Sequence, residues 1–181
     1  QEKNLLAKQK EQQKKVDALN KQIEEMIAKQ VRTTTTLTKE QQLIAGGFEA
    51  NQGRLPWPVE KGFISGYFGK HQHPVHEHVT INNKGIYLQT VAGANARAIY
   101  EGEVSSCAQI NGNYAVIVQH GNYRTVYSPL KKIYVKQGDK VKAKQAIGEI
   151  VTDTSEDNKT ELYFQIYKDR SIINPGLWLA Q

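Results

Sequence analysis

The sequence has one cysteine, Cys107, among 181 residues, and this excludes a disulfide bond within the chain. Because Ser106 and Ala108 flank Cys107 in a predicted strand, we expect a buried and unreactive thiol. No apolar run reaches the ~18 residues of a membrane span, and no charged-then-apolar leader opens the chain. Gln1 already lies in a helical pattern, so we expect the sequence to be part of a longer protein whose targeting signal is not included.

Charge of one sign is not concentrated in either part of the chain. Residues 1–50 contain 9 basic and 7 acidic residues (net +2) and residues 51–181 contain 15 and 11 (net +4), which gives the total of +6. No basic stripe is interleaved with aromatic residues, so the sequence does not predict binding to nucleic acid. The surplus of positive charge is compatible with a location beside an anionic cell-wall polymer or membrane, and equally with a role in solubility alone.

Residues 1–32 contain neither glycine nor proline and predict a coiled-coil helix. Leu5 extends the seam toward the start of the chain, whereas Gln9 and Gln12 fall on the same seam and weaken it. Pairing with another helix of a longer coil and a solvated single helix both remain open. The seam itself alternates steps of three and four residues, as in a coiled coil: Val16, Leu19, Ile23 and Met26.

Residues 33–54 are predicted to be a linker that contains a short helix. The β-branched run from Thr33 to Thr36 ends the coil, because its hydroxyl groups compete for backbone hydrogen bonds. Thr38 followed by Gln41 indicates a capping box, which starts a helix over residues 39–46. Glycines at 46 and 47 are expected to end it.

Residues 55–181 change to short apolar runs separated by glycines, a texture typical of an all-β domain. Trp57 and Trp178 lie in apolar segments next to prolines, so we expect both to be at least partly buried near the two ends of the domain. Helix is expected only in the N-terminal third. The predicted strands cover residues 63–68, 85–89, 97–107, 114–119, 124–128, 146–151 and 161–167.

Four local patterns occur in order along the second part of the chain. Together they resemble the lysostaphin-like, LytM-type peptidases (the peptidase M23 family) over about residues 56–181. The resemblance implies a mainly β fold, a LytM (duplicated-hybrid-motif) β-sandwich or barrel domain that follows a coiled-coil helix and a short helix. The patterns are Gly66-Tyr67-Phe68-Gly69 with His73-Pro74, then Asn82-Asn83-Lys84-Gly85-Ile86-Tyr87, then His120-Gly121-Asn122 with Tyr127-Ser128-Pro129-Leu130, and finally Glu161-Leu162-Tyr163-Phe164 with Asn174-Pro175 and Trp178.

The active members of this family have H-x-G-x-D, Y-x-H-L and H-x-H at three of these places, and each motif is broken here. Matched residue by residue, the zinc-binding His falls on Asn83, the zinc-binding Asp on Tyr87, the catalytic His of the third block on Pro129, the other catalytic His on Glu161, and the last zinc-binding His on Tyr163. The resemblance therefore implies a degenerate peptidase homologue without catalytic residues.

These replacements also bear on the metal, because zinc needs three good ligands with a fourth position left for water. Asn83 offers only a neutral amide oxygen, and the phenols of Tyr87 and Tyr163 stay protonated at neutral pH. Pro129 has no side-chain donor or acceptor, and Glu161 alone does not make a site. We therefore expect no metal site and no zinc cofactor.

Four histidines offer an alternative metal site. His71, His73, His76 and His78 form two H-x-H pairs, which a strand would place on one face. Such a site would make the protein an unorthodox zinc metalloendopeptidase. No nearby Asp or Cys completes a familiar ligand set, so solvated loop histidines are the preferred interpretation.

The resemblance also implies that the former active-site groove is kept for binding. The side chains expected to line it are of types enriched at the centres of interfaces, although several of the tyrosines would equally well pack the groove shut. They are Tyr67, Lys84, Tyr87, Arg124, Tyr127 and Tyr163.

A coiled coil followed by a degenerate LytM-type domain resembles the murein hydrolase activators. This implies a periplasmic protein of the cell envelope whose coil attaches to a membrane complex of the division machinery. Its domain would bind and activate a cell-wall N-acetylmuramoyl-L-alanine amidase. The short helix, through Leu43 and Ile44, would lie across the groove and restrain it, so that its removal strengthens binding, or would be a passive spacer. A peptidoglycan-binding module remains an alternative.

Overall fold

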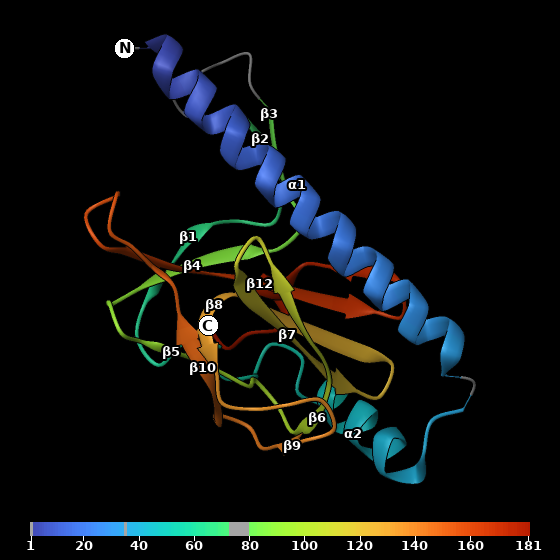
Figure 1. Ribbon diagram of the computed structural model, residues 1–181. Coiled ribbons are helices and arrows are strands. Elements are labelled where there is room, and N and C mark those ends of the chain that lie inside the picture. Colours follow the sequence, from blue (N-terminus) through green and yellow to red (C-terminus); the bar gives the residue numbers. More distant parts are fainter. Residues whose placement is uncertain (1, 35, 73–79) are drawn as a thin grey trace. The chain divides into compact units, whose positions relative to one another are not determined.

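A computed structural model describes residues 2–34, 36–72 and 80–181 of the chain (Figure 1). It divides into two compact units, Gln1–Thr36 and Leu37–Gln181. The first unit is helix α1 (Glu2–Thr33), which confirms the helix predicted there. The Thr33 hydroxyl donates to the carbonyl oxygens of Lys29 (3.0 Å) and Gln30 (3.2 Å) at the end of α1, as expected of a residue that competes with helical hydrogen bonding. Within the described residues, no helix combines the length and the apolar character needed to cross a membrane.

Helix α2 (Lys39–Ala50) belongs to the second unit, so it is part of the folded domain and not of a linker over 33–54. The Thr38 hydroxyl caps it by accepting from the backbone N–H of Gln41 at 3.1 Å, as predicted. The helix nevertheless runs past both glycines, where its end was expected. A side chain at Gly47 would overlap the Tyr100 hydroxyl, and the next residue, Phe48, is fully buried in the core. Close packing here offsets the roughly 1 kcal/mol that a helical glycine costs.

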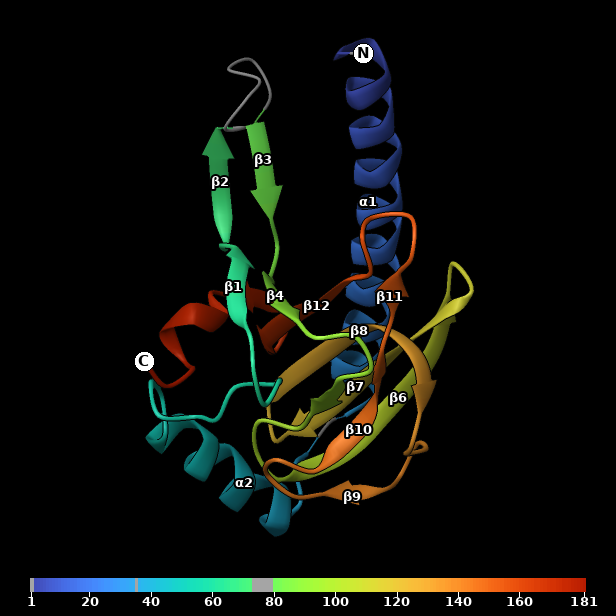
Figure 2. The same cartoon turned by 90° about the vertical axis from the view of Figure 1, so that its left-hand side faces the viewer.

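The domain is built on one large antiparallel sheet, which confirms the mainly β fold. A separate two-stranded sheet extends beyond the end of β1 (Figure 2). The order in the large sheet is β1 (Phe63–Gly66), β4 (Ile86–Thr90), β12 (Lys159–Lys168), β8 (Tyr123–Ile133), β7 (Asn113–His120), β6 (Gly102–Ile110) and β9 (Lys140–Val141). Further strands extend this sheet: β10 (Ala146–Ile150) pairs with β8 and with β5 (Asn95–Arg97), and β12 pairs with β11 (Thr152–Asp153) and β13 (Ser171–Ile173). The small sheet consists of β2 (Gly69–Gln72) and β3 (Thr80–Asn83). A short 3₁₀ helix, η1 (Pro175–Leu177), lies near the end of the chain.

Side chains alternate between the two faces of the large sheet. One face forms the core: β12 contributes Leu162, Phe164 and Ile166, all fully buried. The cross-strand partners of Leu162 and Phe164 on β4 are Leu88 and Ile86, which belong to the same core. We call the opposite side of β4, β12, β8 and β7 the outer face; Tyr87, Tyr163, Gln165, Arg124 and Gln119 are among its residues.

The two ends of the domain meet. Leu55 and Leu179 form a parallel bridge, and Nε1 of Trp57 donates to the carbonyl oxygen of Ala180 at 2.7 Å. Trp178 is 6 % exposed and packs in the core. The predicted burial of both tryptophans near the ends of the domain is therefore confirmed.

Candidate functional site

The structure brings together, on the outer face, three of the five positions that the family resemblance matches to zinc ligands and catalytic histidines. Tyr87 on β4 is the cross-strand partner of Tyr163 on β12, which pairs on its other side with Ser128 on β8. Glu161 lies two residues before Tyr163 and therefore points to the same face. Pro129 follows Ser128 through a cis peptide bond. Asn83, the fifth position, is the last residue of β3 in the small sheet.

A stacked pair of tyrosine rings occupies the two positions that the family resemblance matches to zinc ligands. The ring centroids of Tyr87 and Tyr163 are 4.7 Å apart, and their planes differ by 23°. A Cβ on Gly66 would lie 2.8 Å from Cδ2 of Tyr87, so a side chain there would displace that ring. A Cβ on Gly85 would lie 2.5 Å from the Phe164 carbonyl oxygen and 3.1 Å from Cε1 of Tyr163, so the backbone of β12 requires this glycine before the ring does.

The remaining polar groups of the former site are committed to other partners. Oε2 of Glu161 accepts from the Ser65 hydroxyl at 2.6 Å and lies 3.7 Å from Nζ of Lys159. Nδ2 of Asn83 donates to the carbonyl oxygen of Tyr67 at 2.8 Å. The Pro129 carbonyl accepts from the backbone N–H of Val151 at 3.2 Å.

The alternative histidine site falls largely outside the described residues, since His73, His76 and His78 belong to the segment 73–79. His71 lies on β2, with Nε2 3.0 Å from the carbonyl oxygen of Tyr67. Across residues 2–34, 36–72 and 80–181, no group of three or more His, Cys, Asp or Glu side chains is placed to hold a metal ion. Cys107 is half-buried against the core, not fully buried as expected, and burial raises the pKa of its thiol.

Tyr127 does not line the former groove, and the expectation that it does is wrong. It is fully buried on the core side of β8, with its ring 5.2 Å from that of Phe164. Its hydroxyl accepts from the backbone N–H of Ile99 at 3.1 Å, and burial raises its pKa, so the phenol stays protonated. Strand parity could have shown this, because Arg124 and Tyr127 are three residues apart on one strand and therefore point to opposite faces.

The other expected binding residues differ in exposure. Tyr67 is 61 % exposed, and Lys84 and Tyr87 are half-buried. Arg124 and Tyr163 are only 2 % exposed. Burial lowers the pKa of Arg124, while the nearby charge of Asp169 opposes that change.

Leu43 and Ile44 do not lie over the tyrosine pair. The Leu43 side chain is 78 % exposed, and Ile44 is buried where α2 packs against the domain near the turn between β7 and β8. Tyr123 begins β8 at this turn, whereas Ser128, the partner of Tyr163, lies about 16 Å farther along the strand. The expected placement of this helix across the groove is therefore corrected.

Sequence reasoning missed a chain of buried polar groups on the core side of β7 and β8. Nδ1 of His120 lies 2.7 Å from the carbonyl oxygen of Glu101, and Nε2 lies 2.9 Å from the Thr125 hydroxyl. The Thr125 hydroxyl is in turn 2.9 Å from the Tyr127 hydroxyl. The alternation of His120, Thr125 and Tyr127 with outer-face residues was the signal that could have found this chain.

Comparison with known proteins assigns this domain to a family. The model of "Peptidase family M23" matches residues 81–175. The chain is 27 % identical to the murein hydrolase activator EnvC of Escherichia coli over 138 residues, which are 75 % of this chain and 31 % of EnvC. It is 36 % identical to the peptidoglycan DD-endopeptidase ShyB of Vibrio cholerae over 96 residues, 50 % of this chain and 22 % of that protein. It thus spans less than a third of either relative.

A solved structure also resembles the domain. The SpoIIQ–SpoIIIAH pore-forming complex contains a chain that superposes with a TM-score of 0.58 at 27 % identity, covering 71 % of this chain and 92 % of the other. That protein is seen in a complex with another protein, whereas ShyB is named as an enzyme. Similar domains therefore occur both in a peptidase and in a protein–protein complex.

Proposed function

The chain belongs to peptidase family M23, and we propose that it is a non-catalytic member, a murein hydrolase activator that binds a cell-wall N-acetylmuramoyl-L-alanine amidase and raises its activity. The observation that carries this proposal is the stacked pair of Tyr87 and Tyr163, set between Gly66 and Gly85 where active members have zinc ligands. Protonated phenols are poor ligands for zinc, which needs three good protein ligands at such a site.

The same pair supports a binding role. Tyrosine supplies large contact area with few rotatable bonds, and it is enriched with arginine at the centres of protein interfaces. Ile117 on β7 and Val126 on β8 are cross-strand partners on the outer face, and Val126 pairs with Gln165 of β12. The Ile117 and Val126 side chains are both fully buried, so this apolar strip is available to a protein partner only in a more open conformation.

The similarity to EnvC, a murein hydrolase activator, supports a cell-wall hydrolase as the partner. We propose that this hydrolase is an amidase, that the location is the periplasm, and that α1 is part of a coil that attaches to a membrane complex of the division machinery. The very low exposure of Arg124 and Tyr163 adds a condition to this proposal. A partner that contacts these two side chains must bind a more open conformation, and its affinity is reduced by the fraction of molecules that are closed.

The experiment is a pull-down of purified amidase, and separately of purified sacculi, by the immobilised chain. We expect the amidase to be retained. Tyr87→Ala, which removes half of the stacked pair, should weaken retention, whereas Tyr134→Ala is the matched control because Tyr134 is 48 % exposed and bonds to Asn95 away from the outer face. Retention of sacculi without amidase would overturn the proposal in favour of a peptidoglycan-binding module.

A further inference from the structure

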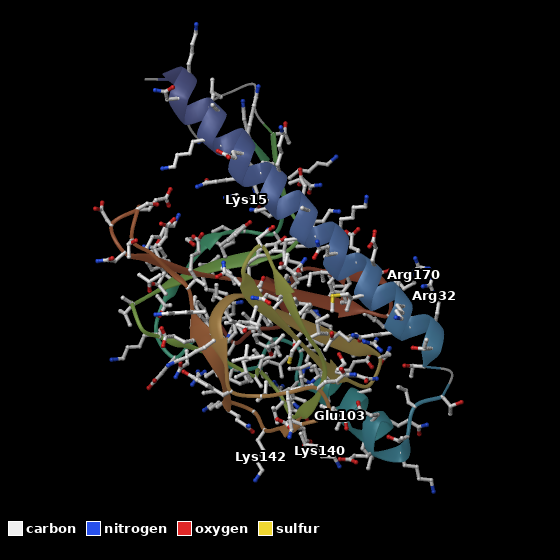
Figure 3. All side chains as sticks on the ribbon, viewed as in Figure 1. Lys15, Arg32, Glu103, Lys140, Lys142 and Arg170 are labelled. Carbon is white, nitrogen blue, oxygen red and sulfur yellow. The ribbon has the colours of Figure 1, made fainter. Side chains whose placement is uncertain are left out.

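Helix α2 makes a specific polar contact with the turn between β7 and β8. Oε1 of Gln41 accepts from the backbone N–H of Gly121 at 2.6 Å. Gly121 has a φ of 70°, and a side chain there would overlap Ala45 of α2, so glycine permits both the turn and the close approach of the helix. The Glu40 carboxylate of α2 also lies 3.0 Å from Nζ of Lys140 on β9, which Figure 3 shows at the same end of the domain as Glu103 of β6.

An apolar contact holds the residues on both sides of this turn. The Phe48 ring of α2 is fully buried and stacks on His120, the last residue of β7, at a centroid distance of 4.8 Å. It also lies 4.9 Å from the ring of Tyr123, the first residue of β8. Trp178 covers Phe48 from the C-terminal segment at 5.2 Å. α2 therefore contacts residues 120, 121 and 123.

The turn is bonded in the other direction to the outer face. Nε2 of Gln119 donates to the Gly121 carbonyl at 3.0 Å, and Gln119 is the cross-strand partner of Arg124. The Asn122 carbonyl accepts from the backbone N–H of Asp169 at 2.8 Å, and the charge of Asp169 acts on Arg124. The peptide groups that place Arg124 thus lie between α2 on one side and outer-face residues on the other.

We propose that Gln41 is a positioning residue for partner binding: through Gly121 it holds the β7–β8 turn and thereby fixes Arg124 at one end of the outer face. This inference rests on the proposed function for its binding readout. Arg124 is only 2 % exposed, so the partner meets it in the more open conformation. An ordered turn in that conformation leaves the Arg124 side chain less conformational entropy to lose when the partner arrives, so affinity rises with the order of the turn. α2 then supports the binding face from behind, and does not cover it.

The test compares three variants of the full chain by calorimetric titration with a purified cell-wall amidase. Gln41→Ala removes the acceptor and should weaken binding about threefold to tenfold, the range of one hydrogen bond. Gln41→Glu keeps an acceptor oxygen and should restore affinity to within about twofold. Leu43→Ala is the matched control on the same helix, because Leu43 is 78 % exposed, and it should leave affinity unchanged.

A double-mutant cycle shows whether the effect passes through Arg124. In an Arg124→Ala background the further loss caused by Gln41→Ala should vanish. A loss of the same size in that background would mean that Gln41 acts by another route, and would overturn the inference.

Hydrogen exchange of the unbound chain gives a readout that needs no partner. The amides of residues 121–124 should exchange faster in Gln41→Ala than in Leu43→Ala or Gln41→Glu, while amides of β12 stay equally protected. Equal exchange at residues 121–124 in all three variants would overturn the inference. Failure of every form to bind amidase would instead reject the proposed function, and exchange would still decide whether Gln41 orders the turn.

Discussion

At the residue scale, His120 has an environment that fixes both its protonation and its tautomer. A carbonyl oxygen can only accept, so Nδ1 carries the hydrogen that is donated to Glu101 at 2.7 Å. Burial lowers the pKa of His120 to about 4, so the ring is neutral at pH 7. Nε2 of a neutral ring then has a lone pair and no hydrogen, and it lies 2.9 Å from the Thr125 hydroxyl. The imidazole also stacks on Phe48, which places α2 over it.

This environment predicts a loss of stability in acid. In the unfolded chain His120 titrates near ~6.5, whereas in the folded chain its pKa is about 4. Between these values the unfolded state binds more protons, so the free energy of unfolding falls as pH drops from about 6.5 to about 4, and this group causes no further loss below that. The expected loss is about 3 kcal/mol, measured by urea unfolding at several pH values.

Carboxylates also titrate in that range, so the control is the same series on His120→Gln. That variant is expected to be less stable at pH 7 but to lose about 3 kcal/mol less than the unsubstituted chain on going to pH 4. Parallel pH profiles for the two proteins would show that burial of His120 does not drive the acid sensitivity.

The former metal site gives a second prediction at this scale. After treatment with a chelator and dialysis against zinc, we expect no stoichiometric zinc at the outer face, because Asn83, Tyr87 and Tyr163 replace the ligands. Restoring one imidazole by Tyr163→His should not change this, since a single ligand does not hold zinc against water. Elemental analysis is the measurement. One tightly held zinc per chain that disappears in Glu161→Ala would contradict the prediction.

Sequence reasoning was most successful for single positions with local constraints. The Thr38 cap depends on near neighbours along the chain and is confirmed, whereas Cys107, expected to be buried, is half-buried and its low reactivity stays a prediction. Tyr127 was misplaced because the family pattern groups Tyr127-Ser128-Pro129-Leu130 as one motif. A strand turns consecutive residues to opposite faces, so one motif need not form one surface.

At the element scale, α2 differs most from its prediction. Residues 39–46 contain few apolar side chains, and the glycines at 46 and 47 are ordinary stop signals. The helix continues because Phe48 finds a site among Tyr100, His120, Tyr123 and Trp178, residues far away in the sequence. Tertiary packing of this kind overrides local propensity.

This packing predicts that α2 is needed for the stability of the domain. Phe48→Ala should lower the free energy of unfolding by about 3–5 kcal/mol, because it removes a fully buried ring and leaves a cavity. Leu43→Ala, at an exposed position of the same helix, should change it by less than about 0.5 kcal/mol. Chemical denaturation at pH 7 measures both.

The same reasoning replaces the expectation that removing residues 37–50 strengthens partner binding. That deletion removes the Phe48 ring and the hydrogen bond from the Gly121 N–H to Gln41, so we expect a less stable or unfolded domain instead. A deletion variant as stable as the full chain would show that α2 is a spacer after all.

The strands were predictable where their sequences are apolar. Each of the seven predicted segments contains a strand, although residues 97–107 hold the end of β5 and most of β6, with a break between Arg97 and Gly102. β2 and β3 were not predicted, because their residues are mostly polar. Backbone pairing from Gly69↔Asn83 to Gln72↔Thr80 holds these two strands together. Such pairing does not require alternating apolar residues, so the sequence shows no strand pattern there.

At the scale of the whole molecule, the M23 domain uses the two faces of the same strands for different purposes, the core and the outer face. The buried core cluster lies entirely within residues 37–181 and includes residues from β4, β12, β8 and β7, the strands that also form the outer face. Tyr87, Glu161 and Tyr163 could change without loss of that core, because alternation separates their face from Ile86, Leu162 and Phe164. Family resemblance located this face from the sequence. The burial of this face depends on contacts between residues far apart in the chain, so the sequence alone did not predict it.

This separation of core and outer face leads to a prediction about activity. The chain alone should release no soluble fragments from purified sacculi, whereas the chain added to a cell-wall amidase should raise the amidase's release of dye-labelled fragments. Tyr87→Ala should reduce that stimulation severalfold while the unfolding temperature stays within a few degrees, because the ring is half-buried on the outer face and not part of the core. Tyr134→Ala should stimulate as the unsubstituted chain does. Fragment release by the chain alone that a chelator abolishes would contradict the prediction and would point to a metallopeptidase. Full stimulation by Tyr87→Ala would mean that the amidase binds another surface of the domain.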